Sequence, residues 1–103
     1  MILDTLTQHL WQTAEKKQEC RLQIWGESKP RVVHPYGVCL TKRNLISLVC
    51  WQTEGFSASN KNVGYRLFIL AHIRSIEMLA SHFHRRDDFN PADGQYKDWV
   101  FHI

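Results

Sequence analysis

The feature that most limits how this chain can fold is a change in the spacing of its apolar residues near Glu19. Before that point they recur every three to four residues, the interval of an amphipathic helix, and they predict a helix over about 3–17. The apolar face of this helix comprises Leu3, Leu6, Leu10, Trp11 and Ala14. From Glu19 onward the interval drops to two, which is typical of a half-buried β-strand. We therefore expect a sheet that begins directly after a single helix.

Short β-rich stretches separated by turn residues follow. They predict strands at about 19–25, 31–40, 45–52, 64–70 and 72–80. The stretch at 45–52 is apolar on both faces, which indicates a central strand covered twice. Positions 53–62 are expected to form a loop whose Phe56 packs back onto the core. The stretch at 72–80 fits a helix as well as a strand, and we favour the strand because of a family resemblance described below.

The last residues, 81–103, form a tail with a less regular pattern. Asn90 followed by Pro91 favours a helix start there, because Asn caps a first turn and Pro is tolerated within it. Gly94 would keep that helix short. The whole chain, 1–103, is expected to be a single domain, since a chain of 103 residues supports one core.

The expected fold class is mainly β (α+β). About five short strands with little helix between them are most economically closed into a small antiparallel barrel, because closure removes sheet edges. We place the barrel at about 19–80, behind the N-terminal helix.

Composition excludes several classes of protein. No apolar run approaches the roughly 20 residues of a membrane helix, so no membrane partner is expected. Met1–Asp4 also lacks the basic flank of a signal peptide. The cysteines, Cys20, Cys39 and Cys50, are odd in number and have no CxxC spacing, which indicates buried free thiols in a reducing cytoplasm. The net charge of +3 permits binding to nucleic acid or other anions without requiring it.

No group of residues in the sequence predicts catalysis. The chain has no GxSxG nucleophile turn, no GxGxxG motif and no GxxxxGK[ST] phosphate loop. His82 and His84 flank Phe83, but two histidines fall short of the three or four ligands that a zinc site needs. We therefore expect a protein that is not an enzyme and that uses no metal and no cofactor; a metalloprotein built on the two histidines is a remote alternative.

Two side chains favour a binding function instead. Trp25 lies on the polar face of its strand beside Arg21 and Gln23, where an exposed indole can stack on a nucleobase and contribute about 1–3 kcal/mol. The alternative is that Trp25 lies buried under the helix or the tail. Arg66 shares a strand face with Phe68, so it either pairs with a buried carboxylate or points into a pocket that accepts an anion. The residues alone leave both alternatives open.

Several stretches occur in an order found in a known family. They are Leu22–Trp25, Arg31–Gly37, Leu45–Cys50, Arg66–Ile73, Phe83 and Asp88–Asn90. The family has an Arg-x-x-x-Pro stretch that leads into a Pro-hydrophobic-Gly turn, which Arg31, Pro35 and Gly37 reproduce. From about Leu3 to Phe89 the chain thus resembles the WYL domain of bacterial regulators.

This resemblance implies an SH3-like, Sm-type barrel and a cytoplasmic, stand-alone regulatory module. Such a module would bind a nucleotide-like ligand or single-stranded nucleic acid and modulate a transcription or nucleic-acid-processing partner. The partner protein would carry the DNA-binding or helicase domain, because only one helix precedes Leu22. Together with the slight positive charge, the resemblance assigns ligand binding to Arg31, Tyr36, Arg66, His72 and Trp25.

Two departures from the family pattern favour a different function. Ile46-Ser47-Leu48 stands where the family has its name-giving Trp-Tyr-Leu, and the segment 68–73 lacks two Arg and one Asp of the family pattern. Loss of guanidinium groups removes bidentate anion recognition. The alternative is a protein–protein interaction module or homodimer with a decayed ligand site, since edge strands can dock a partner or a second copy.

Overall fold

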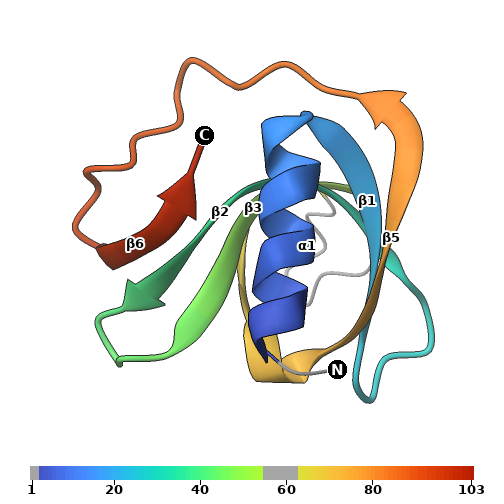
Figure 1. Ribbon diagram of the computed structural model, residues 1–103, viewed down its shortest axis with the longest axis horizontal. Coiled ribbons are helices and arrows are strands. Elements are labelled where there is room, and N and C mark those ends of the chain that lie inside the picture. Colours follow the sequence, from blue (N-terminus) through green and yellow to red (C-terminus); the bar gives the residue numbers. More distant parts are fainter. Residues whose placement is uncertain (1–2, 55–62) are drawn as a thin grey trace.

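The computed structural model describes residues 3–54 and 63–103 (Figure 1). In these ranges an N-terminal helix is followed by six strands and one short 3-10 helix. They are α1 (Leu3–Glu15), β1 (Gln18–Ile24), β2 (Arg31–Thr41), β3 (Ile46–Glu54), β4 (Gly64–Ile69), η1 (Leu70–His72), β5 (Ile73–His82) and β6 (Tyr96–His102). The protein is thus mainly β with an N-terminal helix, as expected. None of the helices in the described ranges has the length and apolar character needed to span a membrane.

The strands form one antiparallel sheet in the order β4-β3-β2-β1-β5, and β6 pairs with β2 beside this path. β2 pairs with β1 near its start, with β3 along most of its length and with β6 near its end. β4 and β5 occupy the two ends of the path, and η1 connects one directly to the other. No ladder joins β4 to β5 within the described residues, so the sheet is not closed and the expected barrel is not confirmed.

The first core lies between α1 and the face of the sheet that curves around it (Figure 1). The helical spacing of Leu6, Leu10 and Ala14 brings all three to this face, where they are buried. They pack with Cys20, Leu22, Ile24, Val33, Val38, Leu48, Cys50, Leu70, Ile73 and Phe101. Because burial of one such side chain contributes about 1.5–3 kcal/mol, this cluster is what fixes the helix on the sheet.

A second core lies on the opposite face of β2 and β3, beneath the C-terminal segment 83–103. Successive side chains of a strand point to opposite faces, so Val49 and Trp51 contact this core whereas Cys50 contacts the first. Its buried members are Tyr36, Cys39, Val49, Phe83 and Phe89, with Trp51, Tyr65, Tyr96, Trp99 and Ile103 packed around them. β3 is therefore covered on both faces, which confirms the prediction for its apolar stretch.

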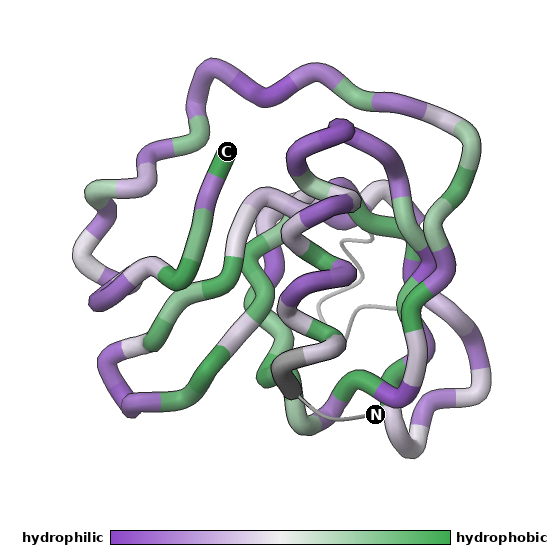
Figure 2. Tube along the Cα trace, viewed as in Figure 1, coloured by the Kyte–Doolittle hydropathy of each residue, from purple (hydrophilic) through white to green (hydrophobic). Residues whose placement is uncertain are grey.

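The C-terminal segment contains a strand in place of the expected helix at Asn90. The side chain of Asn90 accepts a hydrogen bond from the Ala92 amide at 3.1 Å, and its carbonyl accepts one from the Asp93 amide at 3.1 Å. These bonds close a turn, after which the chain enters β6. The predicted helix is therefore wrong, and the described residues contain six strands instead of five. Figure 2 shows a mostly hydrophilic connection between β5 and β6, as expected for a segment at the surface.

Other element boundaries lie close to the expected ones. The ambiguous stretch is a strand, β5, as predicted. α1 ends at Glu15, and Lys17 adopts a φ of 51°, a left-handed conformation that often ends helices. β3 continues to Glu54, so the first two positions of the predicted loop belong to this strand, and 55–62 lie outside the described residues. Phe56, predicted to pack onto the core, lies outside the described residues.

Candidate ligand-binding surface

Trp25 follows β1 directly and has a largely exposed side chain. The alternation along β1 turns Leu22 and Ile24 into the core, which leaves the indole of Trp25 outside with 63% of the residue exposed. Its amide donates a hydrogen bond of 2.9 Å to the carbonyl of His72. The guanidinium of Arg74 lies 5.2 Å from the centre of the ring, within the range of a cation–π contact. The alternative that Trp25 is buried under the helix or the tail is therefore wrong.

Arg74 also lines a hollow on the outer face of β1 and β5. The hollow has a volume of about 430 Å³. Its described lining consists of Arg21, Gln23, Pro30, Arg74, Ser75 and Glu77. Across the strand pair, Arg21 donates a hydrogen bond of 2.7 Å to the carboxylate of Glu77. The hollow thus offers donors and acceptors on both strands, next to the guanidinium that contacts the indole.

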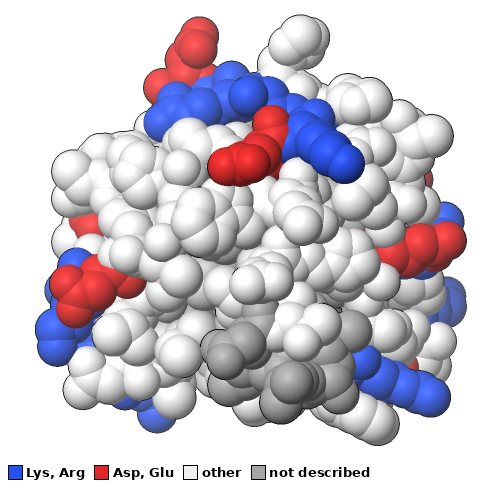
Figure 3. All heavy atoms as spheres, in the orientation of Figure 1, with Lys and Arg blue, Asp and Glu red and all other residues white. Residues whose placement is uncertain are grey.

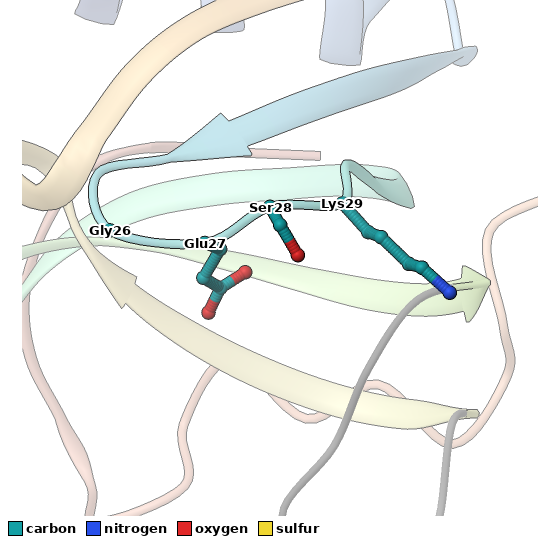
Figure 4. A pocket seen from close by; sticks show the side chains of 4 residues that line it. All are labelled: Gly26, Glu27, Ser28 and Lys29. Carbon is teal, nitrogen blue, oxygen red and sulfur yellow. The ribbon is translucent and has the colours of Figure 1, made fainter.

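A second hollow of about 370 Å³ lies at the turn between β1 and β2 (Figure 4). Its described lining is Gly26, Glu27, Ser28 and Lys29, the four residues that follow Trp25. Gly26 has a φ of 84°, where a residue without a Cβ is favoured. Figure 4 shows the side chains of Glu27 and Ser28 on the same side of the turn, with Lys29 extending away from them.

Arg31 holds this turn in place. Its guanidinium donates two hydrogen bonds to the carboxylate of Glu27, at 2.9 and 2.7 Å, and one to Oε1 of Gln52 at 3.0 Å. The hydrogen bonding by Arg31 holds the pKa of Glu27 below its usual value. The guanidinium also lies 5.1 Å from the ring centre of Phe68. With 11% of its side chain exposed, Arg31 acts as a support for the turn and presents little surface to a ligand.

Tyr36 lies in the second core, on the other face of the sheet. It is fully buried, and its ring is stacked on Phe83 at a centroid distance of 5.6 Å. Its hydroxyl accepts a hydrogen bond of 2.8 Å from the backbone amide of Arg86. Burial raises the pKa of this hydroxyl. The predicted binding residue Tyr36 therefore has no exposed surface in this structure and lies apart from Trp25.

Arg66 lies on β4, on a different part of the sheet from Trp25. It lines a separate hollow with Tyr65, Leu67, Gln95 and Tyr96, and its guanidinium donates a hydrogen bond of 2.9 Å to the Tyr65 carbonyl. Burial raises the pKa of the Cys50 thiol, while the charges of Arg66 and Arg31 act in the opposite direction.

Of the five predicted binding residues, the structure brings Trp25 and His72 into direct contact, while Arg31 supports the adjacent turn. Tyr36 and Arg66 lie elsewhere. Arg74, whose guanidinium contacts the indole, is not among the binding residues predicted from the sequence. Its position beside the indole depends on the pairing of Ile24 with Ile73, and no local sequence pattern predicts that pairing.

Charge is spread over the molecule. On the α1 face shown in Figure 3, Lys, Arg, Asp and Glu lie mainly toward the rim, and uncharged side chains fill the centre. His82 and His84, both exposed, belong to no cluster of three or more metal-ligating side chains within the described ranges. The indole–guanidinium pair is therefore the feature with the clearest chemistry for binding.

Comparison with known proteins gave no match to a family model, to a curated protein or to a solved structure. Function is therefore inferred from the side chains around Trp25.

Proposed function

We propose that this protein is a regulatory ligand-sensing module of the WYL type that binds a nucleotide-like ligand or single-stranded nucleic acid. In this role it modulates a transcription or nucleic-acid-processing partner, which carries a DNA-binding or helicase domain. The observation that carries the proposal is the 63% exposed Trp25 with the Arg74 guanidinium 5.2 Å from its ring centre. An exposed indole beside a cation matches the two parts of a nucleotide, a flat base and an anionic phosphate.

Each group near the indole has a defined part in this proposal. The free face of Trp25 stacks on a base, and the guanidinium of Arg74 pairs with a phosphate, since its planar donors fit two phosphate oxygens. His72 is exposed, and its carbonyl accepts a hydrogen bond from the Trp25 amide, so this residue lies beside the proposed stacking surface. The polar hollow next to Arg74 accommodates the sugar or a neighbouring nucleotide. Arg31 contributes indirectly, by holding the turn that follows Trp25.

We also propose that the curved sheet is an SH3-like, Sm-type barrel that is open between β4 and β5. Support comes from the strand order and from η1, which leads from one end strand straight into the other. A cytoplasmic location is part of the same proposal, because three buried cysteines occur as free thiols.

The test is a titration of fluorescein-labelled oligo-dT and oligo-rU, and of AMP, at 50 mM and 200 mM salt. We expect an affinity that falls as salt rises, because phosphate contacts release counterions. Trp25→Ala should weaken binding about tenfold, since a stacked base contributes about 1–3 kcal/mol. Val100→Ala is the matched control, because Val100 is a large exposed apolar residue on β6 (49% exposed).

Two results would overturn the proposal. One is the absence of binding to all three probes at low salt. The other is an unchanged affinity in Trp25→Ala and Arg74→Gln variants whose circular dichroism matches that of the parent protein.

A further inference from the structure

Two adjacent hollows lie along β4 on the outer face of the sheet, and together they are called the groove. One is about 200 Å³ and is lined by Tyr65, Arg66, Leu67, Gln95 and Tyr96. The other is about 330 Å³ and is lined by Thr41, Lys42, Arg43, Leu45, Ser47, Leu67, Ile69 and Gln95. Leu67 and Gln95 belong to both linings, so the two hollows are adjacent. Neither lining includes Trp25 or Arg74, which makes this groove distinct from the surface proposed above.

The wall formed by β4 has the spacing of an extended chain. Tyr65, Leu67 and Ile69 are alternate residues and therefore share one face of the strand. At about 3.3 Å per residue they span roughly 13 Å, the length of four or five extended residues. Leu67 is 39% exposed, an apolar surface that a partner side chain can cover. β4 is also an end strand of the sheet path, the position at which extended peptides commonly dock.

Arg66 lines the smaller hollow, and a cluster of further cations lies beside the larger one. Lys42 and Arg43 are exposed in the turn between β2 and β3. Lys97 adds a third cation, since its ammonium donates a hydrogen bond of 3.1 Å to the side chain of Asn44 in the same turn. No Asp or Glu occurs among the described residues that line the groove. The ligand that complements this surface is therefore an extended one that carries both apolar and acidic side chains.

We propose that this groove is a docking site for an extended acidic peptide segment of a partner protein. Apolar side chains at alternate peptide positions pack against Leu67 and Ile69, and carboxylates lie beside Lys42 and Arg43. A protein segment fits better than a nucleic acid, because the apolar side chains beside Lys42 and Arg43 are aliphatic. The two rings of the groove, Tyr65 and Tyr96, line the other hollow, where they pack against the second core. The peptide site also gives the module a contact to its partner that is independent of Trp25.

The test uses two sets of fluorescein-labelled eight-residue peptides with Val, Leu or Tyr at alternate positions. One set carries Asp and Glu at the remaining positions, and the other carries Lys and Arg. We expect the acidic set to bind at least tenfold more tightly than the basic set. The double variant Lys42→Glu/Arg43→Glu should lose about tenfold in affinity for the acidic set, and Leu67→Ala should also weaken binding. Lys16→Glu/Lys17→Glu is the matched control, because it reverses two adjacent exposed charges just beyond α1.

Four results would overturn the proposal: equal binding of both peptide sets, no loss of affinity in Lys42→Glu/Arg43→Glu, an equal loss in the control variant, or displacement of the peptide by oligo-dT. A dimer by sedimentation that dissociates on Leu67→Asp substitution would assign the groove to a second copy, and so would also overturn it. Trp25→Ala should bind the acidic peptides like the parent protein, which separates this test from that of the nucleotide surface.

Discussion

At the scale of single residues, the alternation along a strand decides which chemistry a side chain can perform. Neighbouring positions on β1 illustrate this: Ile24 is buried in the first core, whereas Trp25 is exposed next to Arg74. This alternation favours exposure of Trp25, but the usual burial of large aromatic residues favours the opposite, so the sequence alone leaves its exposure open. The burial of Tyr36 could not be predicted, because the register of β2 shifts between Pro35 and Gly37. Such a bulge changes which side chains reach each face.

The first prediction concerns the thiols. Burial raises the pKa of Cys20 to about 12 and that of Cys39 to about 11, and it raises the pKa of Cys50 well above its ordinary value. Since the thiolate is the reactive form, the folded protein should show almost no reaction with an aromatic disulfide reagent at pH 8. Three equivalents should react after unfolding in guanidinium chloride. A thiol that reacts within seconds in the folded protein would contradict the burial.

The second prediction concerns Gly37. A Cβ at this position would lie 2.4 Å from the Phe101 carbonyl oxygen and 2.7 Å from the Trp99 ring. Gly37→Ala should therefore force β6 away from β2 and lower the free energy of unfolding by about 3 kcal/mol, as overpacked cores do. The measurement is chemical denaturation. Gly94→Ala is the control, because a Cβ at Gly94 meets nothing within 4 Å, and an equal loss in both variants would exclude the steric explanation.

At the scale of elements, a polar cluster fastens the C-terminal segment to the outer face of the sheet. Arg86 lies 3.8 Å from the ring centre of Trp51 on β3 and donates two hydrogen bonds of 3.0 Å to Asp88. The same carboxylate accepts a hydrogen bond of 2.6 Å from the hydroxyl of Tyr65 on β4. The segment is thus tied to β4 by a charged hydrogen bond and to β3 by a cation–π contact, above the aromatic core that it covers.

The third prediction follows from the carboxylate in this cluster. Hydrogen bonds from Arg86 and Tyr65 lower the pKa of Asp88 to about 2, against about 3.9 in an unfolded chain. A lowered pKa means that the stabilisation is complete above pH 4 and is lost as the pH falls toward 2. Asp88→Asn should therefore show a weaker dependence of the thermal midpoint on pH between 4 and 2. The neighbouring exposed residue provides the control, and Asp87→Asn should follow the parent protein.

The elements that could be predicted from the sequence are those with a local pattern. The helical spacing of α1 and the apolar stretches of β1 to β5 lie within continuous segments. β6 could not be predicted in this way, because its partner is the distant end of β2 and the turn at Asn90 resembles a helix cap. The same limit applies to the ligand surface: the alternation that favours exposure of Trp25 is local, whereas its contact with Arg74 depends on the pairing of β1 with β5.

At the scale of the whole molecule, the order of the strands determines how strongly the backbone amides of each strand are protected from hydrogen exchange. β2 has partners on both edges, whereas β4 and β5 form the ends of the sheet path. As the fourth prediction, amides of β2 and β3 should exchange with deuterium most slowly, and those of β4 and β5 should include faster ones, because edge amides open by local fluctuations. Exchange followed by NMR tests this. Uniformly slow exchange across all these strands would indicate hydrogen bonds that close the sheet into a complete barrel.

The pairing of β2 with both β1 and β6 has a further consequence. β1 pairs with β2 only at Arg31–Val33, and the part of the edge that it leaves vacant is filled by the chain's own C-terminal strand at Gly37–Thr41. That strand is reached through a long connection, 83–95, which has little regular structure of its own. Such an arrangement is suited to domain swapping. In a concentrated solution, β6 of one molecule can pair with the end of β2 in another, and the reciprocal pairing yields an intertwined dimer with every native contact kept.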